Sequence, residues 1–377
     1  MPEQTVPPHP GKILRQKLEE KGWTQEELAA ITGRNRGTIS GIVSGRTGVT
    51  PEMALALGAA FGNDPAEWLG WSAAYELATT EENLEPVERR ARLYQLAPIR
   101  DMQKRGWLRE TGDLEELERE LVSFFGSHPG ESLNFPVATR RTITLDELNI
   151  AERAWCFRAR QLAALLPTTN SFSPDRLPSV EARLRQLAAF PKEARKLSRV
   201  LMEAGISFVV VEPLPGAKID GAAFWLSERK PAIAVSLRFD RVDAFWFTVL
   251  HEFAHIKNGD QLSVDTDLLK EGANGISVVL AEDAAEQRAN GEAANTLIPK
   301  AELDSFIRRV GPYYSADRIV QFAHKIKMHP GIIVGQLQHR GEVGYSALRD
   351  FLVKIRSVVV ETALTDGWGQ SISPGLI

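Results

Sequence analysis

The hydrophobic positions of the chain change their spacing near residue 205. Before this point apolar residues recur every three or four positions, which is typical of amphipathic helices. After Gly205 the spacing drops to two in runs rich in Val, Ile, Phe and Trp, which predicts three β-strands at 206–216, 222–227 and 231–237. Helical spacing then returns. The pattern therefore predicts an α+β chain with a small sheet in its C-terminal half.

Residues 1–78 are predicted to form an all-α bundle of short helices behind a Pro-rich arm at 1–10. Thr24 and Glu27 have the spacing of a capping box, so they are expected to open the second helix. Gly residues are expected to end several of the others. The helices are expected from Gly11 to Gly22, from Gln25 to Gly33, from Arg36 to Ser44, from Thr50 to Gly62 and from Pro65 onward.

The second and third of these helices have the layout of a helix-turn-helix, whose second helix enters the major groove of double-stranded DNA. Three arginines make a local basic patch around the third helix, and Gln25 is placed to contact a phosphate. The candidate DNA contacts are Gln25, Arg34, Asn35, Arg36, Thr38, Ser40 and Arg46. A small helical bundle that binds protein is the alternative.

Composition narrows the function classes only slightly. The net charge is −4, so a DNA-binding surface must be local and is not a property of the whole chain. The single cysteine, Cys156, excludes an internal disulfide and is expected to be a core thiol. No apolar stretch is long enough for a membrane span and no signal peptide is recognisable, so we expect a cytoplasmic protein.

Residues 79–190 are predicted to be a mostly helical connector without a catalytic constellation. Basic and apolar residues alternate at helical spacing over 89–108, and an acidic helix capped by Asp113 is expected over 113–126. These two helices are expected to pack together, within one chain or across a dimer. A further helix is expected at 151–166, and an extended pair is conceivable within 127–148.

The most specific motif is H-E-x-x-H, formed by His251, Glu252 and His255. Residues four apart lie on one face of a helix, so both imidazoles can converge on one metal ion. Two neutral His ligands, an open position for water and a carboxylate beside it as general base are what a zinc hydrolase needs. Strands followed by such a helix have the zincin layout, in which an edge strand can hold an extended peptide.

A tetrahedral catalytic zinc site requires a third protein ligand. The residues alone leave this choice open. The candidates are Glu282, Asp283, Glu286 and Glu292 on one helical stretch, then Asp260, Asp265 and Asp267, and finally His324 and His329.

Two resemblances sharpen these predictions. The run from Thr24 to Ala78, TQEELAAITGRNRGTISG through WLGWSAAYELA, resembles the Xre/Cro-type helix-turn-helix of HigA-like antitoxins, with Gly37 and Gly41 where relatives often carry longer side chains. The helix FTVLHEFAHIKNGD at 247–260 resembles the ImmA/IrrE family of zinc metallopeptidases. The later run E-x-x-A-N-x-x-A, which starts at Glu286, resembles the same family.

The second resemblance implies roles for individual residues. It implies that His251, His255 and Glu286 bind Zn²⁺ and that Glu252 is the general base. Asn290 matches a structural position, and Glu292 stands where relatives usually have an aromatic residue. His324 and His329 are not required for zinc, so a substrate-pocket or structural role is expected for both. Residues 318–343 are expected to form a helix followed by a strand, as in that family.

The expected organisation has four parts, and their combination predicts the function. They are a DNA-binding domain at 1–78, the connector at 79–190, the zincin-like domain at 191–345 and a C-terminal helix with a tail at 346–377. We expect a homodimeric regulator bound to an operator, whose zinc endopeptidase cleaves a partner regulator, a toxin or its own chain. The alternatives are a non-catalytic antitoxin-like repressor that binds DNA and a protein partner, and a peptidase whose N-terminal bundle binds protein.

Overall fold

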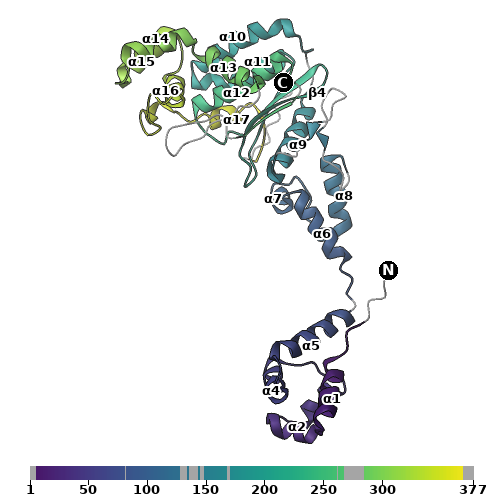
Figure 1. The fold of residues 1–377 in the computed structure, drawn as a ribbon. Coiled ribbons are helices and arrows are strands. Elements are labelled where there is room, and N and C mark those ends of the chain that lie inside the picture. The colour runs from purple at the N-terminus through teal and green to yellow at the C-terminus, as the bar shows by residue number, and fades with distance from the viewer. Residues whose placement is uncertain are drawn as a thin grey trace. The chain divides into compact units, whose positions relative to one another are not determined.

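The computed structural model describes residues 6–80, 82–127, 134–135, 143–144, 148–167, 170–260, 262–266 and 284–367. Contacts between residues group the chain into two compact units, Met1–Glu85 and Pro86–Ile377. Figure 1 shows the helices of the first unit in purple and blue and the elements of the second from blue to yellow. Each unit is described here by itself. In the part of the chain that the structure describes, no helix is long and apolar enough to cross a bilayer.

The described residues of the first unit form five helices, which confirms the all-α prediction for this region. They are α1 (Pro10–Lys21), α2 (Gln25–Thr32), α3 (Arg36–Val43), α4 (Pro51–Phe61) and α5 (Pro65–Thr79). The predicted capping box is present at the start of α2, where Thr24 and Glu27 exchange side-chain and backbone hydrogen bonds. The side chains of Asn35, Thr50 and Asp64 cap the next three helices, each by accepting one hydrogen bond from a backbone N–H in the first turn. Local sequence therefore sets the boundaries of this bundle.

A small apolar core joins these helices. Leu14, Ile39, Leu57 and Trp68 are fully buried in it and come from four different helices. Gly41 has no room for a side chain, because a Cβ there would come within 2.9 Å of the hydroxyl oxygen of Thr47. The loop after α3 therefore approaches this helix closely at Gly41.

The second unit is built on a five-stranded mixed sheet with the order β6-β4-β5-β3-β7. The three strands predicted from the two-residue spacing are present as β3 (Ser207–Val211), β4 (Ile219–Ser227) and β5 (Lys230–Val235). β6 (Leu262–Thr266) and β7 (Leu364–Asp366) were not predicted. β3 runs parallel to β5 and β7, whereas β4 is antiparallel to β5 and β6.

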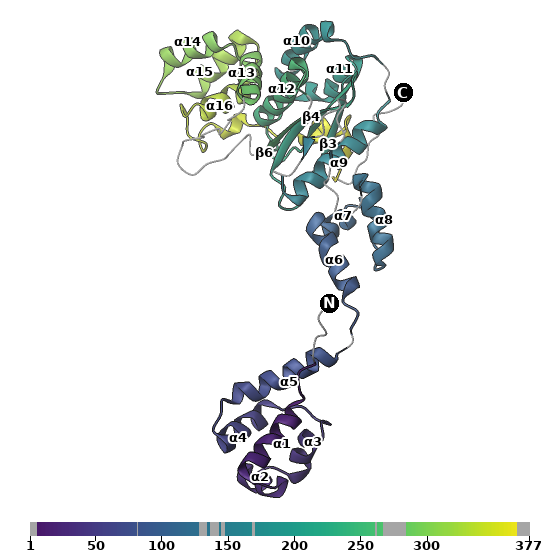
Figure 2. The same ribbon diagram turned by 45° about the vertical axis from the view of Figure 1, so that its right-hand side comes forward.

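Helices cover both faces of this sheet (Figure 2). Ile233 and Val235 of β5 belong to a core shared with α10 (Leu177–Ala188), α11 (Leu197–Glu203) and α12 (Val242–Asn258). Ala232 and Ala234 point to the opposite side and belong to a core shared with α9 (Ile150–Leu165). Because successive strand residues alternate between faces, burial of both faces explains why these strands are almost continuously apolar.

The remaining helices before the sheet pack in the second unit. They are α6 (Glu85–Leu96), α7 (Ile99–Lys104) and α8 (Leu114–Phe125). Arg89 of α6 binds Glu118 of α8 at 2.7 Å, so the basic and acidic helices meet within one chain. Buried residues of α7, α8 and α9 share one core with the sheet, and Cys156 lies buried in it. The residues predicted as a connector therefore contribute to the core of the second unit, while the four-part division of the chain stays a prediction.

Short elements complete this region. Two strands of two residues each, β1 (Asn134–Phe135) and β2 (Ile143–Thr144), pair with each other in antiparallel orientation. They are the extended pair that was considered within 127–148. The 3₁₀-helices η1 (Pro174–Arg176) and η2 (Pro191–Lys196) precede α10 and α11.

The strand predicted near the end of 318–343 is wrong. The segment forms α15 (Ala316–Ile326) and then α16 (Pro330–His339), after α13 (Ala284–Leu297) and α14 (Lys300–Val310). His329 caps α16 by accepting a hydrogen bond from the backbone N–H of Gly331, and Pro330 occupies the first turn, where it needs no donor. Ile332, Ile333 and Leu337 are buried in the core shared with α12, so the apolar run is a buried helix.

The C-terminal helix expected within 346–377 was placed in the run ALRDFLVKI at 347–355, and this placement is wrong. Only a 3₁₀-turn, η3 (Arg349–Phe351), forms there, followed by α17 (Arg356–Val360) and the strand β7. Asp366 of β7 accepts hydrogen bonds from Trp107 and Arg158 in the connector. Such partners, more than 200 residues away in the sequence, cannot be read from local periodicity. The tail at 368–377 lies outside the described residues.

Candidate metal centre and nucleic-acid interface

The centre of the second unit is α12, which carries the H-E-x-x-H motif. Gly259 ends this helix in the left-handed conformation that favours glycine. His251, Glu252 and His255 have exposed fractions of 0, 0 and 1 %. Three ionisable side chains are thus buried on one helix, and burial of such groups is costly unless partners compensate them.

The third member of the cluster comes from α13. Glu286 places Oε2 3.2 Å from Nε2 of His251 and Oε1 3.3 Å from Nε2 of His255. The two Nε2 atoms are 3.0 Å apart. In the described part of the chain, these residues are the group of His, Cys, Asp and Glu side chains whose geometry could hold a metal ion.

The spacing of these atoms fits zinc. A tetrahedral ion with ligands at about 2.0–2.1 Å has its ligand atoms about 3.3 Å from one another. The observed separations of 3.0–3.3 Å are close to this value. Two imidazole nitrogens and one carboxylate oxygen are also ligand types that zinc prefers. The residues present therefore fit the ion that the sequence analysis expected.

Neighbouring side chains orient the cluster. Asp260 lies 2.9 Å from Nδ1 of His255, and a proton on Nδ1 directs the lone pair of Nε2 toward the cluster. Ser263 of β6 donates a hydrogen bond to Glu286 at 3.2 Å. Burial raises the pKa of the Glu286 carboxyl, but hydrogen bonds and charge from His251 and His255 more than offset this effect and hold that pKa below its usual range.

The carboxylate of Glu252 lies against β4. A Cβ atom at Gly221 would overlap that carboxylate and would also contact Thr248 of α12. Gly221 lies next to a shift in the pairing of β4 with β6, where Ile219 faces Thr266 and Gly221 faces Asp265. The absent side chain of Gly221 thus leaves the space that Glu252 occupies.

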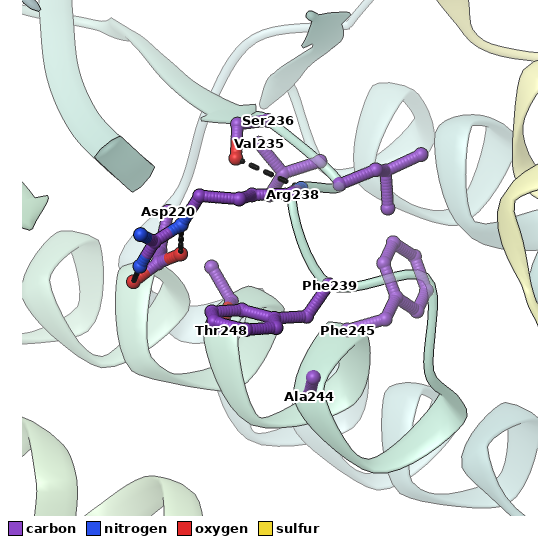
Figure 3. Close-up of a pocket in the computed structure, with 9 residues that line it drawn as sticks. Asp220, Val235, Ser236, Arg238, Phe239, Ala244, Phe245 and Thr248 are labelled. Carbon is purple, nitrogen blue, oxygen red and sulfur yellow. Dashed lines mark hydrogen bonds and ion pairs between the residues drawn. The ribbon is translucent and has the colours of Figure 1, made fainter. Parts of the chain in front are cut away.

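Asp220, the residue before Gly221 in β4, forms a partly buried ion pair with Arg238 (Figure 3). Asp220 accepts hydrogen bonds from Nε and a terminal nitrogen of Arg238 at 3.0 and 3.1 Å, and the backbone N–H of Arg238 donates to the hydroxyl of Ser236. Figure 3 shows Thr248 of α12 beneath this pair. The cavity enclosed there has a volume of about 10 Å³, which is space for one water molecule at most. The pair fixes β4 and the loop after β5 on the side of α12 next to Glu252.

The other third-ligand candidates have different places. Glu292 binds Lys257 at 3.1 Å, and Lys257 also binds Glu181, so the carboxylate in the position usual for an aromatic residue is paired. Asp260 orients His255 instead of completing the cluster. Asp267, Glu282 and Asp283, and the side chain of Asp265, lie outside the described residues.

The two later histidines do not join the cluster. His324 is exposed in the last turn of α15. His329 is the cap of α16, and burial lowers its pKa although the charge of Asp243 acts in the opposite direction. Gly221 and Ser263 also belong to the site, but no sequence motif indicated them. Contacts between separate strands and helices bring them next to Glu252 and Glu286. Phe247, one turn before His251, was seen only as part of an apolar helix.

The candidate DNA contacts gather around α3 in the first unit. Arg34, Arg36, Thr38 and Arg46 are exposed, whereas Gln25 and Ser40 are half-buried. Arg36 forms an ion pair with Glu26 at 2.7 Å, and both side chains are largely exposed. An exposed pair of this kind contributes little stability, so Arg36 can exchange Glu26 for a phosphate or a base.

Three of the candidates make hydrogen bonds within the first unit as well. The side-chain oxygen of Asn35 caps α3 by accepting a hydrogen bond from the backbone N–H of Gly37 at 2.6 Å. Arg34 donates to the backbone carbonyl of Glu52 at 3.3 Å, and Arg46 donates to the hydroxyl of Ser44 at 3.0 Å. The structure therefore brings the predicted residues onto and around one exposed helix.

Comparisons with known proteins concern this N-terminal fifth of the chain. The helix-turn-helix family model matches residues 14–68. The virulence-associated protein A' of Dichelobacter nodosus is 36 % identical over 77 residues, which are 20 % of this chain and 67 % of that protein. The uncharacterised HTH-type transcriptional regulator YddM of Escherichia coli is 34 % identical over 86 residues, which are 23 % of this chain and 90 % of that protein.

A solved structure of similar sequence is the Pseudomonas aeruginosa antitoxin HigA with the higBA promoter. It is 34 % identical, with a TM-score of 0.19, and the match covers 19 % of this chain and 80 % of that one. The chain belongs to the Xre-type helix-turn-helix family of transcriptional regulators.

Proposed function

We propose that this chain is an operator-binding regulator whose second unit is a zinc-dependent endopeptidase. The peptidase part of this proposal rests on the convergence of His251, His255 and Glu286. The buried Glu252 lies on α12 between the two histidines in the sequence. A zinc ion held there supplies Lewis acidity, which polarises a peptide carbonyl and makes a water molecule more acidic. The substrate class is a protein: a partner regulator, a toxin or the chain itself.

Each residue of the centre has a defined task in this proposal. Glu252 accepts the proton of the attacking water and delivers it to the leaving amine. Asp260 holds His255 in one orientation, and Ser263 holds Glu286. β6 is one of the two edge strands of the described sheet and carries Ser263, so an extended peptide paired with its outer edge would pass close to Glu286.

The test of the peptidase is Glu252→Gln in the full chain. The variant keeps the size of the side chain and all three proposed ligands, so it should still bind one zinc per chain. Cleavage of candidate partner proteins should fall by about 100-fold or more, the usual contribution of a general base. Equal function of both forms in every proteolytic assay would instead favour the non-catalytic repressor, which binds DNA and a protein without hydrolysis.

For the first unit we propose specific binding of double-stranded DNA by α3, with a homodimer on a palindromic operator. A single helix-turn-helix reads only a short half-site, and dimers read two half-sites about one helical turn apart.

A selection from random double-stranded DNA tests this part. The purified full chain should enrich two inverted half-sites from a random duplex library, and Arg36→Ala should weaken binding to the enriched duplex. If Arg36 contacts a phosphate, the slope of log K against log salt concentration should also become smaller by about one. Failure to enrich any sequence would favour the reading in which the N-terminal bundle binds protein.

A further inference from the structure

A small cavity lies beside the proposed metal centre. Its volume is about 100 Å³, and α12, α13 and α16 form its walls. Its lining includes Phe247 of α12, Asn290, Ala294 and Leu297 of α13, and Ile332 and Gln336 of α16. The lining is mostly apolar. Since α13 and α16 meet α12 here, the cavity belongs to the second unit alone.

The cavity lies one helical turn from the ligands. Phe247 precedes His251 by four residues, and Asn290 follows Glu286 by four, a separation of about 6 Å along each helix. The ring centroid of Phe247 lies 6.1 Å from that of His251 and 6.4 Å from that of His339. Phe247 therefore contacts the metal cluster on one side and the cavity on the other. A peptide held at the cluster would have a neighbouring side chain within reach of this space.

The charges around the cavity are compensated. Asp243 is paired with Arg241 at 2.7 Å, and Arg340 is paired with Asp304 at 2.5 Å. Gln336 donates its side-chain amide to the backbone carbonyl of Ala294 at 2.8 Å. These polar groups are already engaged within the chain. A charged side chain that entered the cavity would lose its hydration and would meet only the neutral polar groups of Asn290 and His339, which is unfavourable.

The volume limits the size of an occupant. A cavity of about 150 Å³ binds benzene, and a water molecule takes about 30 Å³ in the liquid. A space of about 100 Å³ therefore accepts three or four non-hydrogen atoms but no aromatic ring. Val, Leu, Ile and Met side chains have this size and are apolar.

We propose that this cavity is the specificity pocket of the peptidase and takes one aliphatic side chain of the cleaved peptide, next to the scissile bond. The proposal rests on the proposed metal centre and names the substrate class of that site. Burial of a Leu side chain in such a space is expected to strengthen binding by about 10-fold or more. The cavity thus selects for peptides with an aliphatic residue beside the bond that is cut.

The experiment measures binding, not turnover. Succinyl hydroxamates that differ in one side chain (hydrogen, isobutyl, benzyl or carboxymethyl) are titrated by calorimetry into the zinc-loaded full chain. The isobutyl compound should bind at least about 10-fold more tightly than the unsubstituted one. The benzyl and carboxymethyl compounds should show no such gain.

Two variants and a control locate the effect. Ala294→Leu fills the cavity and should remove the advantage of the isobutyl group, whereas Ala284→Leu, at an exposed position of the same helix, should preserve it. If Ala294→Leu does not fold, Gln336→Ala offers the opposite change, since the larger space should let the benzyl compound gain affinity. The proposal would be wrong if the wild type showed no preference for the isobutyl compound, or if all variants showed the same preference.

The outcomes separate this inference from the proposed function. Zinc binding with no side-chain preference overturns the pocket and leaves the metal centre intact. Isobutyl preference without any proteolysis supports the pocket and contradicts the peptidase. A chain that binds no zinc would overturn the metal centre and the pocket together.

Discussion

The two candidate sites differ in how they are built. The DNA-binding surface consists of exposed or half-buried side chains on and around α3, whose strongest described contact is an exposed ion pair between Arg36 and Glu26. The metal centre consists of side chains almost without exposure on α12, joined by Glu286 from α13. One candidate site is thus an exposed surface, and the other is a largely buried cluster of ionisable side chains.

This difference has an energetic consequence. Single changes at an exposed surface remove one contact and leave the rest of the fold undisturbed. Changes in a buried cluster remove a partner on which other buried polar groups depend. Substitutions in the second unit should therefore change zinc affinity or cleavage rate strongly, whereas substitutions in the first unit should change its stability only slightly.

His251→Ala is expected to show the largest effect. It removes one of three proposed ligands, so zinc affinity should fall by more than about 100-fold, the upper cost of losing an outer partner of a ligand. Competition with a chromophoric chelator measures this affinity. His324→Ala is the control, since His324 is exposed outside the cluster. Unchanged zinc content in His251→Ala would contradict the proposed centre.

Gly221→Ala tests whether β4 positions Glu252. The new methyl group would overlap the Glu252 carboxylate, so proteolysis should fall by about 100-fold while zinc stays bound. Gly291→Ala is the matched control, because a Cβ there meets nothing within 4 Å. Zinc stoichiometry and cleavage rate are measured on the same samples. Cleavage at the wild-type rate would show that Glu252 does not need this space.

Asp260→Asn probes the orientation of His255 and should have an intermediate effect. The carboxylate that fixes Nδ1 is replaced by an amide, which should weaken zinc binding by about 10–100-fold. Asp317→Asn, at an exposed position of α15, serves as control. An affinity equal to that of the wild type would mean that Asp260 contributes only to the local fold.

Thr24→Ala should have the smallest effect, because it removes a cap in the exposed first unit. The free energy of local opening of α2 should fall by about 1 kcal/mol, as measured by amide hydrogen exchange in the full chain. Thr24→Ser retains a hydroxyl and should behave like the wild type. If the free energy of opening fell by much more than this, the first unit would not depend on many small local contacts.

The same cap predicts a pH dependence. Hydrogen bonds from the backbone and side chain of Thr24 lower the pKa of Glu27 in the folded state. The folded pKa lies below the unfolded one, so this stabilisation is present above about pH 4.3 and is lost as the pH falls through the folded pKa. The difference between wild type and Thr24→Ala should therefore be larger at pH 7 than at pH 3.

Local sequence determined the first unit almost completely. The capping box of α2, the cap of α3 by Asn35 and the glycines that end the helices act between residues at most four apart, so they can be read without knowledge of the fold. The same holds for the spacing of His251 and His255 on one helix face. The three central strands were also predictable, because they are short apolar runs with β-branched and aromatic residues, bounded by Pro and Gly.

Only the tertiary structure decided what these elements meet. Apolar runs such as that of α16 are compatible with a strand or a buried helix, and packing against α12 selects the helix. The edge strands β6 and β7 are stabilised by pairing with β4 and β3, which are distant in the sequence. The proximity of Glu286 to the two histidines, the space that Gly221 leaves for Glu252 and the cavity beside Phe247 depend on such long-range contacts, which no local pattern encodes.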